Sequence, residues 1–185
     1  MKSYLKSFNV LSDEEIGILL QSASTKVIDK YEYFIREGEV CKEVAFIKSG
    51  IFRSFYISGK GEEITYCINF PGNMMTAYSS FITKQSTPEN IQAICPAELL
   101  TVPVSLIDQW SAQGSSWSHF LRIMAEQQYI ELEKRVFQLQ RDNAIQRYSS
   151  LLKDHPEYIK NIPLQYLASY LGISQRHLSR IRKTF

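Results

Sequence analysis

The sequence has few of the residues that hold metals or disulfides. Its three cysteines, Cys41, Cys67 and Cys95, stand far apart, and no Cys-X-X-Cys pair occurs. This spacing excludes the usual patterns of a zinc ribbon or an iron–sulfur cluster. We therefore interpret the cysteines as small apolar core residues of a reduced protein.

Motifs of enzymes and membrane proteins are missing as well. The chain has no phosphate-cradling glycine loop, nucleophile elbow or paired-carboxylate signature. No signal peptide and no apolar run of transmembrane length occurs. We expect a cytoplasmic protein that makes no membrane contact, is not an enzyme, and has no catalytic residue, metal or cofactor.

The net charge is small overall, but the charges are unevenly placed. The chain has a net charge of +2 over 185 residues, but five cations and one acid follow Pro156. The end of the chain thus carries +4, and the remainder carries −2. A near-neutral body with a basic end favours a nucleic-acid-binding module attached to another domain.

The first half of the chain predicts an antiparallel β-roll or jelly roll. Ser12 and Glu15 have the spacing of a capping box, which predicts a short helix before the roll. Beyond Thr25, runs of β-branched and aromatic residues alternate with glycine-containing turns, as in a sandwich or roll. Strands are expected within 27–35 and over 44–50, 51–57, 63–70, 91–95 and 98–103, with a short helix over 105–110.

A long helix is predicted over 115–140, because this stretch contains neither proline nor glycine. Apolar residues recur along it at intervals of four and three, the rhythm of a coiled-coil seam. A twenty-five-residue helix spans roughly 37 Å, which is longer than a small roll needs. We therefore expect a dimer, although such a stripe also suits an intramolecular core. The predicted dimer seam consists of Ala125, Tyr129, Leu132, Val136 and Leu139.

A second apolar stripe on this helix, formed by Phe120, Ile123, Ile130 and Phe137, is expected to lean on the roll. Another helix is predicted over 143–154, ended by His155 and Pro156. Its expected inward face consists of Ala144, Ile145, Tyr148, Leu151 and Leu152.

The last twenty-five residues have the pattern of a helix-turn-helix. Leu164, Leu167, Ala168 and Leu171 form one apolar helical face, and Gly172 follows as a helix-ending residue. Ser174 can cap a second helix, whose inner face holds Leu178 and Ile181. The outer positions bear cations, amides and hydroxyls but no acid, which suits base edges and phosphates. The predicted DNA-binding residues are Ser174, Gln175, Arg176, His177, Ser179, Arg180, Arg182 and Lys183.

The whole plan resembles the Crp/Fnr superfamily of bacterial transcription regulators. The resemblance covers nearly the full chain. It is sharpest at 147–152, 162–173 and 178–182. In these stretches the sequence is similar to the short members of the family that are common in Bacteroidetes. It implies a sensor roll at 1–114, a dimerisation helix at 115–140 and a DNA-binding domain at 141–185. It also implies base contacts from Gln175, Arg176 and Arg180, and backbone contacts from Ser174, His177 and Ser179. We expect Arg182 and Lys183 to contact phosphates.

Two departures from this family are visible. Family members that bind cyclic nucleotides carry Gly-Glu and Arg-Ser pairs around the cyclic phosphate, where this chain has Thr76-Ala77 and Thr87-Pro88. We therefore do not expect cyclic AMP binding. We also expect no β-wing of the kind that usually follows the second helix of the helix-turn-helix in this family. Candidate lining residues for another effector are Thr76, Ala77, Tyr78, Ser79, Ser80, Phe81 and Thr87, which alternatively only fill the roll.

The predicted function is that of a homodimeric regulator that reads two-fold symmetric DNA through 174–183 under the control of an effector at the roll. RNA polymerase is a candidate partner, although no stretch marks a surface for it. One alternative is a cupin-like enzyme, but His119, His155 and His177 all lie in the helical half. The other is a ligand-binding protein without DNA contact, which the basic reader helix argues against.

Overall fold

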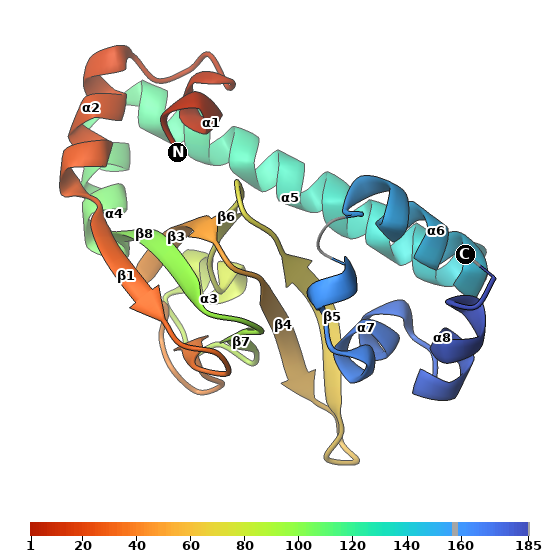
Figure 1. Ribbon diagram of the computed structural model, residues 1–185. Helices are drawn as coiled ribbons and strands as arrows, with labels where there is room; N and C mark the ends of the chain where they lie inside the picture. Colours follow the sequence, from red (N-terminus) through yellow and green to blue (C-terminus); the bar gives the residue numbers. More distant parts are fainter. Residues whose placement is uncertain (157–158, 185) are drawn as a thin grey trace.

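Two antiparallel sheets, a long helix and a small helical end make up the computed structural model, which describes residues 1–156 and 159–184 (Figure 1). The expected α+β architecture with an N-terminal roll is confirmed. The strands are β1 Ser24–Ile28, β2 Tyr33–Ile35, β3 Glu43–Ser49, β4 Phe52–Ile57, β5 Glu63–Asn69, β6 Met74–Met75, β7 Asn90–Ala93 and β8 Ala97–Pro103. The helices are α1 Lys2–Lys6, α2 Asp13–Ser22, α3 Tyr78–Thr83, α4 Val104–Gln113, α5 Ser115–Arg141, α6 Ala144–Asp154, the 3₁₀ turn η1 Ile159–Asn161, α7 Leu164–Leu171 and α8 Gln175–Ile181.

The roll is built from two four-stranded sheets. One has the strand order β1-β8-β3-β6 and the other β2-β7-β4-β5, and all of these pairings are antiparallel. Pairs such as Val44–Val102 and Phe52–Ala93 set a register that turns apolar side chains into the space between the sheets. Because β5 is an edge strand, its outer side is left for the helical end of the chain to cover.

Two of the helices begin at capping boxes. Ser12 and Glu15 form the predicted capping box at α2, and Asn143 with Gln146 forms another at α6. Helix α5 runs diagonally across the molecule, with α1, α2 and α4 near its beginning and α6 to α8 near its end (Figure 1). None of the helices in the described part of the chain is long and apolar enough to cross a membrane.

Some expectations were wrong. Tyr31 lies in a turn with a φ of 68°, not in a strand, and helices α1 and α3 were not foreseen. Ile130 and Phe137 are exposed and therefore do not lean on the roll, and Ile145 points to solvent from α6. Helices of five and six residues give too short an apolar period to recognise. The three exposed side chains belong to helices whose other faces make the intramolecular contacts.

A second apolar core joins the roll to the helical end. Ile51, Ile68, Phe70 and Ile94 of the roll pack with the buried residues of α6, α7 and α8. The stacking of His155 on Phe70, with ring centroids 3.9 Å apart, belongs to this contact. The domain boundaries at 114 and 140 remain a prediction. The second core contains residues from both sides of each boundary.

Candidate nucleic-acid interface and effector pocket

Helices α7 and α8 meet through the predicted glycine turn. Gly172 has a φ of +66°, and the amide of Ile173 donates to the carbonyl of Ala168 at 3.0 Å, which closes the end of α7. Ser174 caps α8 by accepting the amide hydrogen of His177 at 3.2 Å. Ala168 is fully buried, as the close approach of two helices requires. The local geometry is therefore that of a helix-turn-helix.

The outer side of α8 is basic and open. The exposed side chains are Gln175, Arg176, His177, Arg180 and Lys183, with Ser174 exposed at the cap and Ser179 and Arg182 half-buried. In residues 1–156 and 159–184, no carboxylate forms an ion pair with any of the four cations. Arg182 differs from the others because it donates to the carbonyl of Ile159 at 3.3 Å. Arg176, Arg180 and Lys183 are thus the cations most available to a polyanion.

Two arginines from neighbouring helices hold the C-terminal end of α7. Arg135 of α5 donates to the carbonyl of Tyr170 and stacks on its ring at 3.9 Å, and burial lowers the pKa of Arg135. Arg147 of α6 donates to the carbonyl of Leu171 at 3.0 Å. These donors satisfy carbonyls that a helix end leaves unpaired, and their charge suits the negative end of the helix dipole. The helix-turn-helix of α7 and α8, which we call the reader unit, is therefore tied to α5 and α6.

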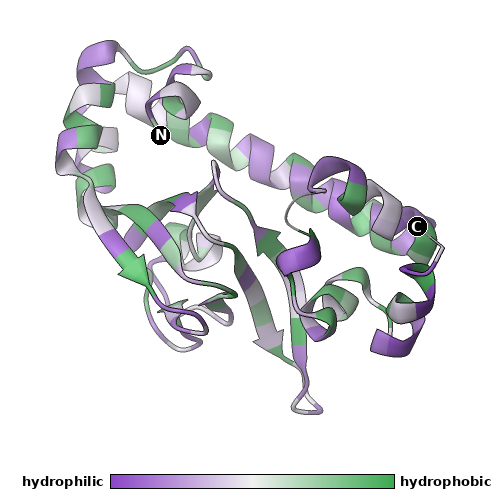
Figure 2. Ribbon diagram, viewed as in Figure 1, coloured by the Kyte–Doolittle hydropathy of each residue, from purple (hydrophilic) through white to green (hydrophobic). Residues whose placement is uncertain are grey.

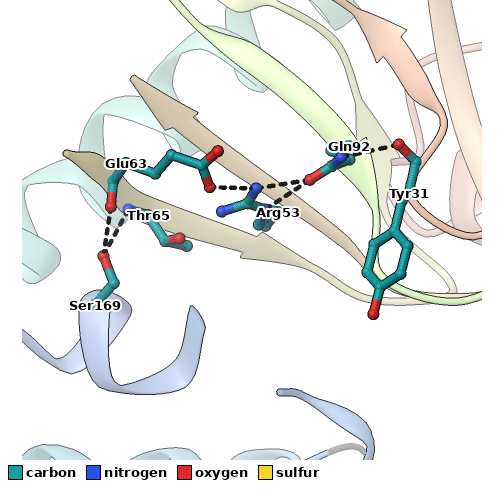
Figure 3. A network of polar contacts seen from close by, with 6 residues as sticks. All are labelled: Tyr31, Arg53, Glu63, Thr65, Gln92 and Ser169. Carbon is teal, nitrogen blue, oxygen red and sulfur yellow. Dashed lines mark hydrogen bonds and ion pairs between the residues drawn. The ribbon is translucent and has the colours of Figure 1, made fainter. Parts of the chain in front are cut away.

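A buried arginine forms the contact between the roll and α7. Arg53 on β4 is 2% exposed, and its Nε and Nη2 donate to the Gln92 amide oxygen at 3.0 and 2.7 Å (Figure 3). Nη2 also pairs with Glu63 at 2.6 Å. The guanidinium lies between the rings of Phe55 and Tyr166, at 3.8 and 3.7 Å from their centroids. Since Tyr166 belongs to α7, one cation joins both parts of the molecule.

Ser169 of α7 completes this contact on the edge strand. It accepts the amide hydrogen of Thr65 at 2.9 Å and donates to the carbonyl of Glu63 at 3.3 Å (Figure 3). A single hydroxyl thus pairs with two backbone groups of β5 that a neighbouring strand would otherwise satisfy. We call the contacts of Arg53, Glu63, Gln92, Tyr166 and Ser169 the arginine junction.

The predicted dimer seam lies on the open side of α5. Tyr129, Leu132, Val136 and Leu139 are 66%, 60%, 40% and 45% exposed, and Ala125 is half-buried. Hydrophobic bands recur along this helix between hydrophilic ones up to its C-terminal end (Figure 2). A row of large apolar side chains left open on one helix is typical of a surface that a partner covers. The dimer seam remains a prediction.

The predicted effector residues lie in different environments. Thr76, Tyr78 and Phe81 line a cavity of about 110 Å³ between the roll and the first half of α5. Ala77, Ser80 and Thr87 are buried, whereas Ser79 is exposed. The Ser80 hydroxyl accepts from the amide of Cys41 at 2.9 Å, so it serves the local fold. The structure brings only part of this set to one cavity.

The positions expected for a cyclic phosphate carry no cation here. The Thr76 hydroxyl donates to the carbonyl of Glu43 at 3.2 Å, and the Thr87 hydroxyl accepts from the amide of Glu89 at 3.2 Å. The Glu89 carboxylate is buried and accepts a hydrogen bond from Tyr66. Burial raises the pKa of Glu89, and burial together with Glu89 raises that of Tyr66. An acid beside this position disfavours a phosphate.

Sequence reasoning missed the residues that anchor the reader. Arg53 stands between aromatic residues in a strand, which is a weak signal for a buried cation. Arg135 and Tyr166 lie within helical patterns that predict only exposed or apolar positions. Nothing in the sequence indicates that α7 packs on β5, because the two elements are about a hundred residues apart.

Comparison with known proteins gives matches in sequence and in fold. Residues 25–113 match the cyclic nucleotide-binding domain family. The anaerobic regulatory protein of Haemophilus influenzae is 24% identical over 171 residues, which are 86% of this chain and 66% of that protein. The chain therefore spans just under two thirds of this relative's length.

Solved structures share the arrangement over most of the chain. FixK2 from Bradyrhizobium japonicum superposes with a TM-score of 0.77 at 18% identity, covering 88% of this chain and 83% of that one. A protein from Eubacterium rectale described as a Crp/Fnr-family transcriptional regulator gives 0.76 at 17% identity, covering 99% and 87%. At these identities the likeness concerns the fold.

Proposed function

We propose that this chain, which matches the cyclic nucleotide-binding domain family at residues 25–113 and shares the fold of solved Crp/Fnr regulators over nearly all its length, is a homodimeric, sequence-specific DNA-binding transcription regulator of the Crp/Fnr superfamily. We further propose that it acts in the cytoplasm and that an effector at the roll controls it. RNA polymerase remains a candidate partner.

The open basic side of α8 carries this proposal. Arg176 and Arg180 are four residues apart, hence on one side of the helix, and both are exposed. An arginine can donate two hydrogen bonds to O6 and N7 of guanine in the major groove. We assign Arg180 to base recognition, together with Gln175 and Arg176. Lys183, at the exposed end of α8, contacts a phosphate and contributes salt-dependent affinity without sequence preference.

The exposed apolar seam on α5 supports a dimer. A recognition helix of two turns covers only a few base pairs, so a second copy at the next half-site adds the affinity that one copy lacks. The seam residues Tyr129, Leu132 and Val136 would pair with the same residues of a second copy around a two-fold axis. Arg135, which donates from α5 to the carbonyl of Tyr170, then ties each reader unit to the helix that carries the seam.

The rival functions have less support. The histidines lie on α5, just after α6 and on α8, so they do not converge in the roll as a cupin site requires. A ligand-binding protein without DNA contact does not account for an unpaired basic helix face set on a helix-turn-helix.

The proposal is tested by selecting bound sites from random duplex DNA and measuring affinity for the recovered site. Replacing Arg180 with Ala should weaken binding about 10- to 100-fold and relax preference at one base of each half-site. Arg122→Ala removes the same charge from an exposed position on α5 and should leave affinity unchanged. Equal affinity of the wild type for selected and scrambled duplexes would overturn the proposal.

The seam is tested on the same protein. Leu132→Glu should place two like charges across the two-fold axis and yield monomers in sedimentation. The matched control is Gln127→Glu, which adds the same charge to an exposed position of α5 outside the seam. A dimer that survives Leu132→Glu places the interface elsewhere.

A further inference from the structure

The cavity of about 110 Å³ is enclosed by the roll on one side and by α4 and α5 on the other. It lies where the first half of α5 passes the end of the roll that carries β6 and α3 (Figure 1). Its apolar walls come from α2, β3, β6, α3, β8, α4 and α5. These wall residues are Leu19, Val44, Met74, Met75, Tyr78, Phe81, Val102, Ile107, Trp117, Phe120, Leu121 and Met124.

Polar groups are few in this cavity, and none of its lining residues is charged. Polar side-chain groups come from Asn69, Thr76 and Gln128, together with the hydroxyl of Tyr78 and the indole N–H of Trp117. The Thr76 hydroxyl is already engaged with the carbonyl of Glu43, and the Asn69 amide nitrogen donates to Ser54 at 3.2 Å. Gln128 is exposed on α5 at the rim. A ligand would thus meet largely apolar walls with a few neutral polar groups, and a charged ligand would lose its hydration without a charged partner.

The size of the cavity sets the size of a ligand. A protein cavity of about 150 Å³ lined by Leu, Ile and Phe takes up benzene or xenon. A cavity of about 110 Å³ is smaller than this, so it suits a molecule of about six non-hydrogen atoms at most, and a slightly larger one only where the walls adapt. Met74, Met75 and Met124 allow such adaptation, because methionine side chains reshape at low cost. A cyclic nucleotide is too large for this space and carries a charge that it cannot pair.

We propose that this cavity is the effector site and that its ligand is a small, neutral, largely apolar molecule with at most one or two polar atoms, such as a substituted single ring. The inference rests on the proposed function, because an effector presupposes an output to control. A ligand here touches Leu121, Met124 and Gln128, which lie on α5 within two turns of the seam residues Ala125 and Tyr129. Ligand binding therefore changes the packing of the helix that sets the spacing of the two reader units.

The two tryptophans of the chain give a direct readout. Trp117 lines the cavity, and Trp110 stacks on it with ring centroids 4.8 Å apart. Titration of the full-length protein with toluene or cyclohexanol should change the tryptophan fluorescence with saturation. Benzoate, which has the same ring with a charge, and cyclic AMP should produce no saturable change. Affinity for the selected DNA site, measured on the same samples, should change at least threefold at saturation.

Two substitutions at the cavity wall, one that fills the cavity and one that conserves its volume, test the site directly. Met124→Phe should abolish the saturable fluorescence response, whereas Met74→Leu, which conserves volume at the cavity wall, should retain it. Urea unfolding of both variants checks that each is folded. Should Met124→Phe not fold, protection of the wild type against urea by toluene supplies the same information, since a ligand of the native state raises its stability.

The outcomes separate the two proposals. Saturation with cyclic AMP, no saturation with either neutral probe, or a DNA affinity unchanged within twofold at saturation overturns the ligand inference while leaving DNA binding intact. Failure to bind any selected duplex, with or without probe, overturns the proposed function itself.

Discussion

Besides the second apolar core, two contacts between the roll and the helical part of the molecule differ in chemistry. At the first half of α5 the contact is apolar and encloses free space, with Trp117, Phe120 and Met124 among its walls. At α7 it is polar and close-packed, and Arg53 is stacked between two rings and bonded to Gln92 and Glu63. One contact encloses a cavity, and the other is a network of buried hydrogen bonds, an ion pair and stacked rings.

The difference bears on how the proposed effector would act on the reader unit. Apolar contacts are non-directional, so α5 can shift over the cavity without breaking a specific bond. Moving Arg53 out of its site would strand a buried amide and a charge, so α7 keeps its position on the roll until this network is disrupted. We infer that the cavity contact is the adaptable one and that the arginine junction holds the reader in place.

The largest effect is expected at the arginine junction. Arg53→Ala leaves the Gln92 side chain without its donor and opens a void between Phe55 and Tyr166. The free energy of unfolding should fall by about 3 kcal/mol, the sum of a lost buried hydrogen-bond group and a small cavity. Urea unfolding measures it, with Arg122→Ala on exposed α5 as the control expected to change by less than about 0.5 kcal/mol. If Arg53→Ala lost no more unfolding free energy than Arg122→Ala, the arginine junction would contribute little to stability.

The next prediction contrasts added volume at two buried positions. Ala168→Val at the crossing of α7 and α8 should cost about 2 kcal/mol, because no space is available there. Val102→Ile, equally buried but on the cavity wall, should cost less than about 0.5 kcal/mol, because the extra methyl enters free volume. Chemical denaturation measures the change in the free energy of unfolding for both variants. Equal costs would mean that the cavity is not available as space.

A smaller effect is expected from Ser169→Ala. The substitution removes the acceptor of the Thr65 amide and the donor to the Glu63 carbonyl. Stability should fall by about 1 kcal/mol, and the Thr65 amide should exchange with solvent faster, as amide hydrogen exchange would report. Ser149→Ala, at an exposed position of α6, is the control. Unchanged protection of Thr65 would contradict the assignment of this contact.

The smallest expected effect concerns Glu89, whose partner Tyr66 lies on β5, the strand that meets α7. Burial raises the pKa of Glu89 above its ordinary value of 4.5, so the folded protein binds this proton more tightly than the unfolded chain. Stability should therefore fall as pH rises from about 4.5 through the folded pKa. Glu89→Gln should remove that part of the pH dependence in unfolding curves. A pH profile identical to that of the wild type would contradict it.

The reader unit was predictable because its signals are local. Gly172, Ser174 and the apolar positions of α7 and α8 act within two helical turns, and each has the predicted structural role. The positions of the main strands along the chain followed from glycine turns and β-branched runs for the same reason, whereas their order in the two sheets was not predicted. The seam and the base contacts stay predictions, because the structure holds neither a second copy nor DNA.

What the sequence did not reveal depends on long-range contacts. Arg53 is an ordinary cation in the sequence, and only the approach of Tyr166 makes it a buried junction. The exposure of Ile130 and Phe137 could not be foreseen, since a helical stripe does not tell which side the roll covers. The cavity likewise arises where seven elements meet, and no spacing in the chain marks it.

The central claim is that two copies of this chain read a two-fold symmetric DNA site through α8. Sedimentation of the protein with a labelled selected duplex tests it most directly. We predict a complex of two protomers per duplex that is lost when one half-site is scrambled or when Arg180 is replaced by Ala. A complex of one protomer per duplex, or one indifferent to scrambling, would contradict the account.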